Sequence, residues 1–245
     1  MMAHGIPPQA FQMTRLGSDR VGQMLALQEE VCRCLESSDL YFPLTAAEMQ
    51  EMVDGDSLSF GAQLGAKLIG FFGVVFLQDA PDNVGIDLGL PQQDLSQIAY
   101  FKAVNVLPEY RGAGVQKMLT RALFDALGAQ APPGLPGATS KFDIVVNRGY
   151  SWLCATVSPR NLASLKSFLD SGFVIAGLKP KYRGHMRCLM IRKPHLETQH
   201  VLNKKTVDLH HYDAQKELLR RGWVGVGLQT SRNTPQIQYI QTITK

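Results

Sequence analysis

Two changes of pattern fall within the stretch Val104-Asn105-Val106-Leu107-Pro108-Glu109-Tyr110-Arg111-Gly112-Ala113-Gly114-Val115-Gln116: a strand pattern ends and a helix pattern begins. Residues 98–106, which end inside it, are rich in aromatic and β-branched side chains and predict a strand. Pro108 lacks an N–H group and ends the strand ladder. After Gly114 the apolar residues recur at the spacing of a helix with one buried face: Val115, Met118, Leu119, Ala122, Leu123, Ala126 and Leu127. We therefore expect a helix over 112–129.

The turn between this strand and this helix has the chemistry of an anion site. The first N–H groups of a helix have no intrahelical acceptor, and the helix dipole is positive at that end. Gly112 and Gly114 carry no side chain that would keep a bulky anion from the backbone. The turn therefore predicts a site for a phosphorylated ligand, although it matches neither G-x-x-x-x-G-K-[ST] nor G-x-G-x-x-G.

The pattern Val106-x-Pro108-x-x-Arg111-Gly112-x-Gly114 resembles the coenzyme A-binding motif of the GNAT superfamily, the acyl-CoA-dependent N-acyltransferases. The resemblance implies that backbone N–H groups of the turn hold the pyrophosphate of acetyl-CoA, and that the preceding strand pairs with the pantetheine arm. The residues it assigns to the cofactor are Val104, Val106, Arg111, Gly112, Ala113, Gly114, Val115, Gln116 and Lys117. Gln116 departs from the Gly or Ala that is common in the family, at a position where the donors are backbone groups.

A second segment, 157–173, resembles the closing motif of the family, N-x-x-A-x-x-x-Y-x-x-x-G-F. It assigns Asn161 and Phe168 to cofactor contact. Phe168 stands where many members have a tyrosine that protonates the departing thiolate, and a phenyl ring cannot donate a proton. Tyr182 is therefore the candidate catalytic residue, because the last hairpin returns near the cleft in this fold. The alternative for Tyr182 is a half-buried hairpin aromatic, and for Asn161 an N-cap.

The order of expected elements resembles a GNAT domain over 11–193. The implied fold class is α/β (α+β), with a mixed, mostly antiparallel central sheet flanked by helices. Besides the elements above, we expect strands over 11–16, 57–64, 67–77, 152–157, 173–176 and 186–191, a helix capped by Ser18, a helix after Thr45, a helix that Gly172 ends, and loops over 78–97 and 128–141.

Three segments are expected: a flexible leader 1–10, the acyltransferase domain 11–193 and a C-terminal extension 194–245. In the extension the patterns predict a helix over 213–221 and strands over 223–230 and 236–244. The extension could add strands to the sheet, cover the substrate cleft or join two subunits into a homodimer. We expect no internal repeat.

Composition restricts the partners only weakly. The chain has 245 residues, 45% of them hydrophobic, and a net charge of +4, which does not suggest a nucleic-acid partner. Four irregularly spaced cysteines favour a reducing compartment, and we expect a cytoplasmic protein. The longest apolar run, 68–77, is too short to span a bilayer, so no membrane partner is expected. His210 and His211 are adjacent and cannot present both rings to one metal, so no metal site is expected.

The sequence does not identify the general base. Asp87 and Asp94 precede the cofactor strand, but such residues are more often loop or capping carboxylates. The basic residues of the last hairpin are more typical of a solvated face than of a contact with a phosphate or an acidic substrate: Lys179, Lys181, Arg183 and Arg187.

Two functions therefore follow from the resemblance. The first is transfer of an acetyl or short acyl group from acyl-CoA to a primary amine by direct attack in a ternary complex. The alternative is a catalytically silent module that binds coenzyme A or another protein. The acceptor, a small molecule or a peptide amine, is not readable, because acceptor pockets in this fold are built from variable loops.

Overall fold

The computed structural model describes residues 11–78, 80, 82–129, 150–194, 200–231 and 233–243. The expected leader and most of the loop 128–141 lie outside these residues. The described residues form two compact units. The first comprises 11–38, 42–77 and 99–129, and the second comprises 39–41, 78–98 and 150–243.

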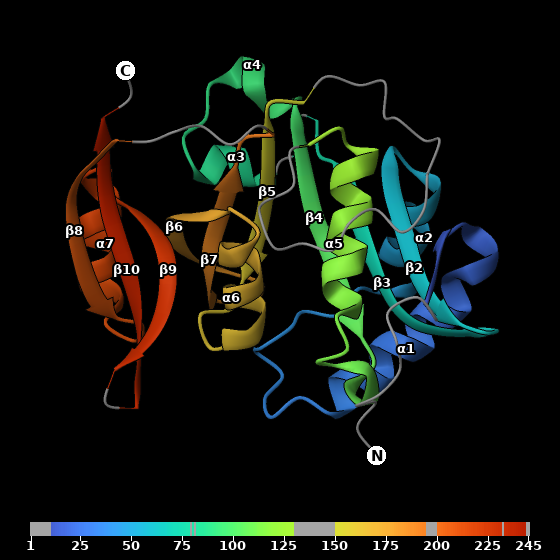
Figure 1. Ribbon diagram of the computed structural model, residues 1–245. Coiled ribbons are helices and arrows are strands. Elements are labelled where there is room, and N and C mark those ends of the chain that lie inside the picture. The colour runs from blue at the N-terminus through green and yellow to red at the C-terminus, as the bar shows by residue number, and fades with distance from the viewer. Residues whose placement is uncertain are drawn as a thin grey trace. The chain divides into compact units, whose positions relative to one another are not determined.

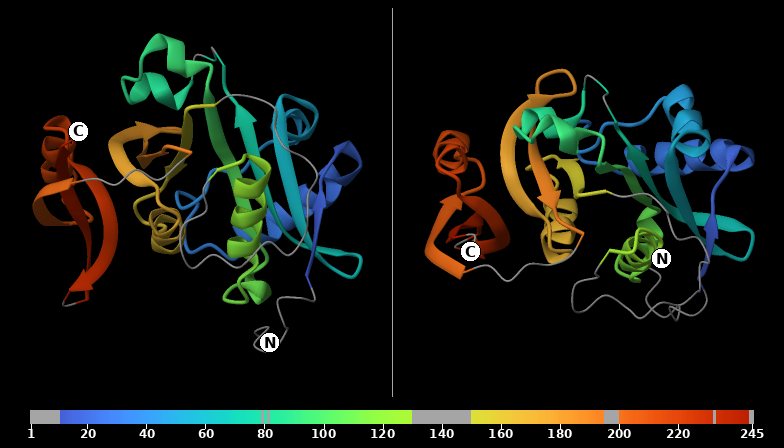
Figure 2. Two further views of the ribbon diagram at one scale, coloured as in Figure 1. Left: turned by 45° about the horizontal axis from the view of Figure 1, so that its top comes forward. Right: turned by 90° about the horizontal axis from the view of Figure 1, so that it is seen from above.

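The first unit is an antiparallel sheet with helices on both faces. Its strands follow the order β1-β2-β3-β4, and each pairs antiparallel with the next. Figure 1 shows α5 on one face of this sheet and α1 and α2 on the other, and the two views of Figure 2 agree. The elements are β1 Gln12–Arg15, α1 Val21–Arg33, α2 Ala46–Asp54, β2 Ser57–Leu64, β3 Lys67–Phe76, β4 Ile98–Val106 and α5 Val115–Ala126.

Two glycines of β3 let helices approach opposite faces of the sheet. A Cβ at Gly73 would lie 2.2 Å from Sδ of Met52 in α2, and a Cβ at Gly70 would lie 3.2 Å from Cγ1 of Val115 in α5. Because neighbouring side chains along a strand point to opposite faces, residues three apart serve different helices. Gly70 thus fixes how closely the first turn of α5 lies to the sheet.

Aromatic side chains fill much of the core of the first unit. Phe72 and Phe101 meet edge to face with ring centroids 5.1 Å apart, and Phe101 and Phe124 lie 6.3 Å apart. All three are buried. Such pairs each stabilise a core by about 0.5–1.5 kcal/mol beyond the burial of their surface. They join β3 and β4 to α5.

The second unit holds six strands in the order β5-β7-β6-β9-β10-β8. Its reported pairings are all antiparallel. The elements are α3 Val84–Asp87, α4 Gln92–Leu95, β5 Trp152–Val157, α6 Leu162–Asp170, β6 Val174–Lys181, β7 His185–Arg192, β8 His200–Asp208, α7 Tyr212–Arg220, β9 Val224–Ser231 and β10 Thr234–Ile243.

Most expected elements are confirmed, and three expectations about them are wrong. Ser18 does not cap a long helix, because α1 begins at Val21 after a 3₁₀ turn and the Ser18 hydroxyl donates to Asp54 instead. The expected loop 78–97 contains the short helices α3 and α4. Strand β8 was not expected, since its alternation is interrupted by the run Asn203-Lys204-Lys205.

Helix α2 begins after Thr45, as the sequence predicts, and the structure shows a capping box at its start. The Thr45 hydroxyl accepts from the Glu48 N–H at 3.2 Å, and the Glu48 carboxylate accepts from the Thr45 N–H at 2.9 Å. The backbone hydrogen bond from Thr45 lowers the pKa of Glu48. Replacing Thr45 by alanine removes the hydroxyl that accepts from the Glu48 N–H. The ordered part of the helix then begins later.

We expect Thr45→Ala to lower the free energy of unfolding by about 1 kcal/mol. The folded pKa of Glu48 is below its ordinary value of 4.5, so its contribution is present above that pH and is lost as the pH falls through the folded pKa. The Thr45 hydroxyl also donates to this carboxylate at 2.9 Å. The stability difference between wild type and variant should therefore shrink in acid. Urea unfolding at neutral pH and at about pH 3 measures it, and a difference that grows in acid contradicts the assignment.

Candidate active site

The strand that leads into the glycine turn carries a β-bulge. Gly73 of β3 faces Ala103, whereas the next residue, Val74, faces Phe101, so Lys102 is the extra residue on β4. A bulge raises the local twist and redirects the side chains around it. Val104 is half-buried and Val106 is buried, both on the strand segment between the bulge and the turn. The sequence gives no signal for this bulge, because Lys102 continues the strand pattern.

The turn itself has the conformation that an anion site needs. After a 3₁₀ turn over Pro108–Tyr110, Gly112 has φ 80° and Gly114 has φ 81°, both in the left-handed region that favours glycine. Apart from their neighbours in the chain, no heavy atom of the described residues lies within 4 Å of a Cβ built at either glycine. The described residues thus leave room beside both glycines.

Helix α5 starts directly at Gly114, and among the described residues no side chain caps it and no acid lies in its first turn. Arg111 and Lys117 flank the turn and are exposed. An uncapped helix start with exposed cations on both sides of it in sequence has the chemistry that suits an anion. All nine residues predicted for the cofactor from 104 to 117 lie on this one strand, turn and helix start.

Glu109, the carboxylate nearest the turn in sequence, is held by a neighbouring strand. Its carboxylate accepts from Nζ of Lys67 at 2.9 Å, and the same Nζ lies 5.3 Å from the centre of the Tyr110 ring. Burial is the largest single influence and would raise the pKa of Glu109, but the hydrogen bond and the charge of Lys67, together with a backbone hydrogen bond, outweigh it and the pKa is lowered. Its negative charge is thus paired within the first unit.

Asn161 caps α6 and fixes a distant loop. Its Oδ1 accepts from the Ser164 N–H at 3.1 Å, and its Nδ2 donates to the Leu40 carbonyl at 3.3 Å. The capping alternative is therefore correct for Asn161, and its contact with the cofactor stays a prediction.

Phe168, on the same helix, is 8% exposed and meets Phe173 edge to face at 5.1 Å. Its packing explains the choice of an apolar ring, and its cofactor contact also stays a prediction.

Tyr182 lies at the tip of the hairpin between β6 and β7 in a strained conformation. Its φ of 47° is left-handed, as is that of Arg183, at a cost of about 1–3 kcal/mol per residue. Its hydroxyl shares a hydrogen bond of 3.1 Å with Oγ1 of Thr156 on β5, and the Arg187 guanidinium lies 5.6 Å from its ring centre. Two neighbours thus orient the hydroxyl of the predicted catalytic residue.

The carboxylates considered as a general base have structural partners. Asp87 accepts from both Lys179 and Lys181. Burial is the largest single influence and would raise the pKa of Asp87, but the hydrogen bonds and charges of the two lysines together outweigh it and the pKa is lowered. Asp94 accepts from Nε1 of Trp152 at 3.0 Å. Both carboxylates are thus engaged with structural partners, which favours structural roles over the role of a general base.

The interpretation of the last hairpin as a solvated basic face is wrong for Arg187. This residue is only 3% exposed, and its Nη1 donates to the Asp39 carbonyl at 2.7 Å. Arg160 holds the same residue, since its Nη1 lies 2.9 Å from the Asp39 carboxylate. Two arginines and Asn161 therefore fix the segment 39–41. No sequence pattern could reveal contacts between residues so distant along the chain.

The described residues contain no group of three His, Cys, Asp or Glu side chains that could hold a metal ion. In the described part of the chain, no helix has both the length and the apolarity that a bilayer span requires.

Comparison with known proteins decides which fold this is. No protein-family model and no curated protein matches the sequence. Solved structures do match. The chain has the GNAT fold. A putative acetyltransferase from Salmonella typhimurium with its cofactor acetyl-CoA has a TM-score of 0.53 at 10% identity, over 77% of this chain and 96% of that one. The ribosomal-protein-S18-alanine N-acetyltransferase from Escherichia coli has a TM-score of 0.51 at 14% identity, over 79% and 99%.

An N-acetyltransferase from Staphylococcus aureus Mu50 matches at a TM-score of 0.52 and 11% identity, over 75% of this chain and 97% of that one. These neighbours are covered almost completely, whereas about a quarter of this chain lies outside each match. The GNAT fold is thus present as a whole, and the chain has additional structure beyond it.

Proposed function

We propose that this chain is an acetyl-CoA-dependent N-acetyltransferase that acts on a primary amine. The observation that carries the proposal is the turn after β4, where Gly112 and Gly114 leave open space beside an uncapped helix start. The residues present fit a diphosphate, because backbone donors converge there and the acid Glu109 is paired with Lys67. The GNAT fold and the Salmonella neighbour with acetyl-CoA support the same ligand.

The residues of the chain have the following roles in this proposal. Main-chain amides from Gly112 to Lys117 bind the pyrophosphate, and Arg111 adds charge. Val104 and Val106 offer backbone groups of β4 to the pantetheine arm. Asn161 and Phe168 contact the cofactor, as the resemblance implies. Acetyl-CoA supplies a thioester whose carbonyl carbon accepts a nucleophile.

For each turnover the acceptor nitrogen forms a bond to the acyl carbon as the carbon–sulfur bond breaks. The nitrogen loses a proton, and the leaving sulfur needs one or a field that stabilises its charge. Tyr182 holds a proton on an oriented hydroxyl and is the proposed donor to sulfur. Solvent takes the proton of the amine, since Asp87 and Asp94 are engaged elsewhere. Holding both substrates together supplies much of the rate.

The acceptor is a small-molecule or peptide amine. The Escherichia coli neighbour is named for an alanine of a ribosomal protein, which makes peptide N-termini the first acceptors to try. We place the activity in the cytoplasm.

A specific observation also favours a second function, a module that binds coenzyme A without transfer. Phe168 has no hydroxyl and is packed into the core against Phe173. One experiment separates the two functions. Release of free thiol from acetyl-CoA is measured across a panel of peptide and small amines, together with calorimetric binding of acetyl-CoA. Binding with amine-dependent thiol release supports the enzyme, binding without release supports the module, and absence of binding contradicts both.

A further inference from the structure

The second unit contains the same β–α–β–β arrangement twice. Helix α6, Leu162–Asp170, recurs as α7, Tyr212–Arg220, and strand β6, Val174–Lys181, recurs as β9, Val224–Ser231, each fifty residues later. We name residues 152–192 the first copy and 200–243 the second copy. Identical residues at this offset include Thr156 and Thr206, Val157 and Val207, Leu169 and Leu219, Gly172 and Gly222, Gly177 and Gly227, and Leu178 and Leu228.

The backbone repeats in detail at the end of each helix. Gly172 has φ 83° and Gly222 has φ 78°. The N–H of Phe173 donates to the Phe168 carbonyl at 3.1 Å, and the N–H of Trp223 donates to the Leu218 carbonyl at the same distance. The glycine that ends the helix and the aromatic residue that starts the next strand are thus the same device in both copies.

The strand pairing repeats as well, including an irregularity. In the first copy Ile175 faces Met190 and Gly177 faces Leu189, so Ala176 is passed over. In the second copy the corresponding pairs are Gly225 with Tyr239 and Gly227 with Gln238, and the residue passed over is Val226. Two unrelated hairpins would not share a bulge at the same position. The expectation that the chain holds no internal repeat is therefore wrong.

The two copies meet as two identical subunits would. Strands β6 and β9 pair antiparallel through Ile175 and Gly225, which are equivalent positions of the two copies. Helix α6 packs on β9, and α7 packs on β6. In a two-fold interface contacts are reciprocal, and a residue on the axis meets its own equivalent. This junction has both properties within one chain.

The second copy keeps the scaffold but not the residues that hold the segment 39–41. His211 stands in the place of Asn161. In β10 the strand register makes Gln236 the equivalent of Arg187, because the second copy is one residue shorter before this strand. In the first copy both residues hold the segment 39–41. The second copy therefore preserves packing positions and lacks the polar groups that hold this segment in the first copy.

The junction fits the second copy better than it would fit another first copy. A Cβ at Gly225 would lie 3.1 Å from Cβ of Ile175 and 2.9 Å from Cγ2 of Ile237. Two isoleucines facing each other at this position would overlap. Glycine on one side therefore makes room for the isoleucine on the other.

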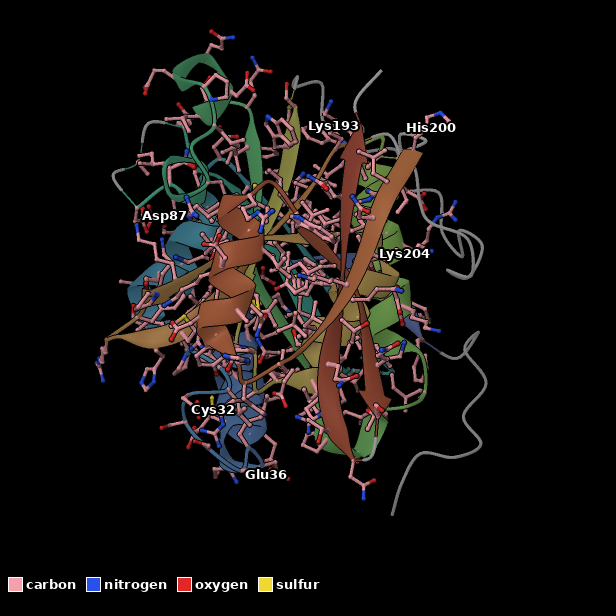
Figure 3. All side chains as sticks on the ribbon, turned by 90° about the vertical axis from the view of Figure 1, so that its left-hand side faces the viewer. Cys32, Glu36, Asp87, Lys193, His200 and Lys204 are labelled. Atoms are coloured by element: carbon pink, nitrogen blue, oxygen red, sulfur yellow. The ribbon has the colours of Figure 1, made fainter. Side chains whose placement is uncertain are left out.

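We propose that residues 200–243 occupy the β6 edge in place of a second subunit, so that this edge is closed to another copy of the chain. The second copy itself ends in an open edge at β8, the last strand in the sheet order, where His200 and Lys204 lie in Figure 3. Exposed lysines such as Lys204 and Lys205 oppose pairing of an open edge with another strand. The proposal does not depend on acyl transfer.

The test uses the full chain with a protease site introduced between Pro194 and His200. After cleavage, native mass spectrometry should show the two pieces still bound one to one. Separation of the C-terminal piece, or pairing of two N-terminal pieces with each other, would overturn the proposal.

Two alanine variants of the cleaved protein sharpen this test. Gly225→Ala places a Cβ against Ile175 and should raise the dissociation constant of the pieces about tenfold or more. Gly227→Ala, in the same strand, is the matched control, because its Cβ would meet nothing closer than 3.5 Å. Equal effects of the two variants would contradict the junction. If Gly225→Ala does not fold, native mass spectrometry of the cleaved wild type still tests the proposal.

Discussion

Acetyl-CoA binding should fall about a hundredfold in Gly114→Val, which corresponds to about 2.8 kcal/mol. Gly114 has φ 81°, a conformation that is an outlier for a β-branched residue. The variant can relieve this strain only by turning the peptide groups at the start of α5. The N–H groups that we assign to the pyrophosphate would then point elsewhere. Isothermal titration calorimetry measures the dissociation constant directly.

The control for backbone strain is Gly65→Val in the hairpin between β2 and β3. Gly65 has φ 60°, and a Cβ there meets nothing within 4 Å, so the substitution costs similar strain in the same unit. Both variants should lose about 1–3 kcal/mol of stability, but only Gly114→Val should lose binding. If acetyl-CoA binds Gly114→Val as it binds wild type, the turn does not hold the cofactor.

A second large effect is expected for Tyr182→Phe, which should lower kcat by about a hundredfold. The substitution removes the hydroxyl that Thr156 orients and keeps the ring beside Arg187. KM for acetyl-CoA should stay nearly constant, because the hydroxyl acts on the leaving sulfur and not on binding. Steady-state kinetics with an accepted amine measures both constants.

The leaving group provides the control for Tyr182. In an acetyl thioester of an acidic aryl thiol, the aryl thiolate leaves as a stable anion and needs no proton donor. With such a donor substrate, wild type and Tyr182→Phe should react at similar rates. A Thr156→Val variant removes the partner that lies 3.1 Å from the Tyr182 hydroxyl but keeps that hydroxyl. With acetyl-CoA its kcat should lie between those of wild type and Tyr182→Phe. An equal loss with both thioesters would assign Tyr182 to structure alone.

Local chemistry explains what could be predicted from the sequence. Pro108, Gly112 and Gly114 each act through their own backbone, so their effect on the turn is readable without knowledge of the fold. The same holds for Thr45 and Glu48, which form a capping box through neighbours three residues apart. The strand β4 and the helix α5 therefore lie where the pattern places them.

Contacts between distant segments could not be predicted. Arg187 reads as one of several basic residues of a hairpin, and only the fold brings it to Asp39. The repeat could not be predicted from the sequence, because the two copies share mainly glycines and aliphatic residues, which any sheet protein contains. Its evidence lies in backbone conformation, such as φ at Gly172 and Gly222, and in strand register.

The most direct measurement of the central claim is a titration of the isotope-labelled protein with acetyl-CoA, followed through backbone amide resonances. We predict that the amides of Gly112, Gly114 and the first turn of α5 shift most, and that those of Gly65 and its hairpin do not. Shifts confined to other segments, or no saturable shift at all, would contradict the account.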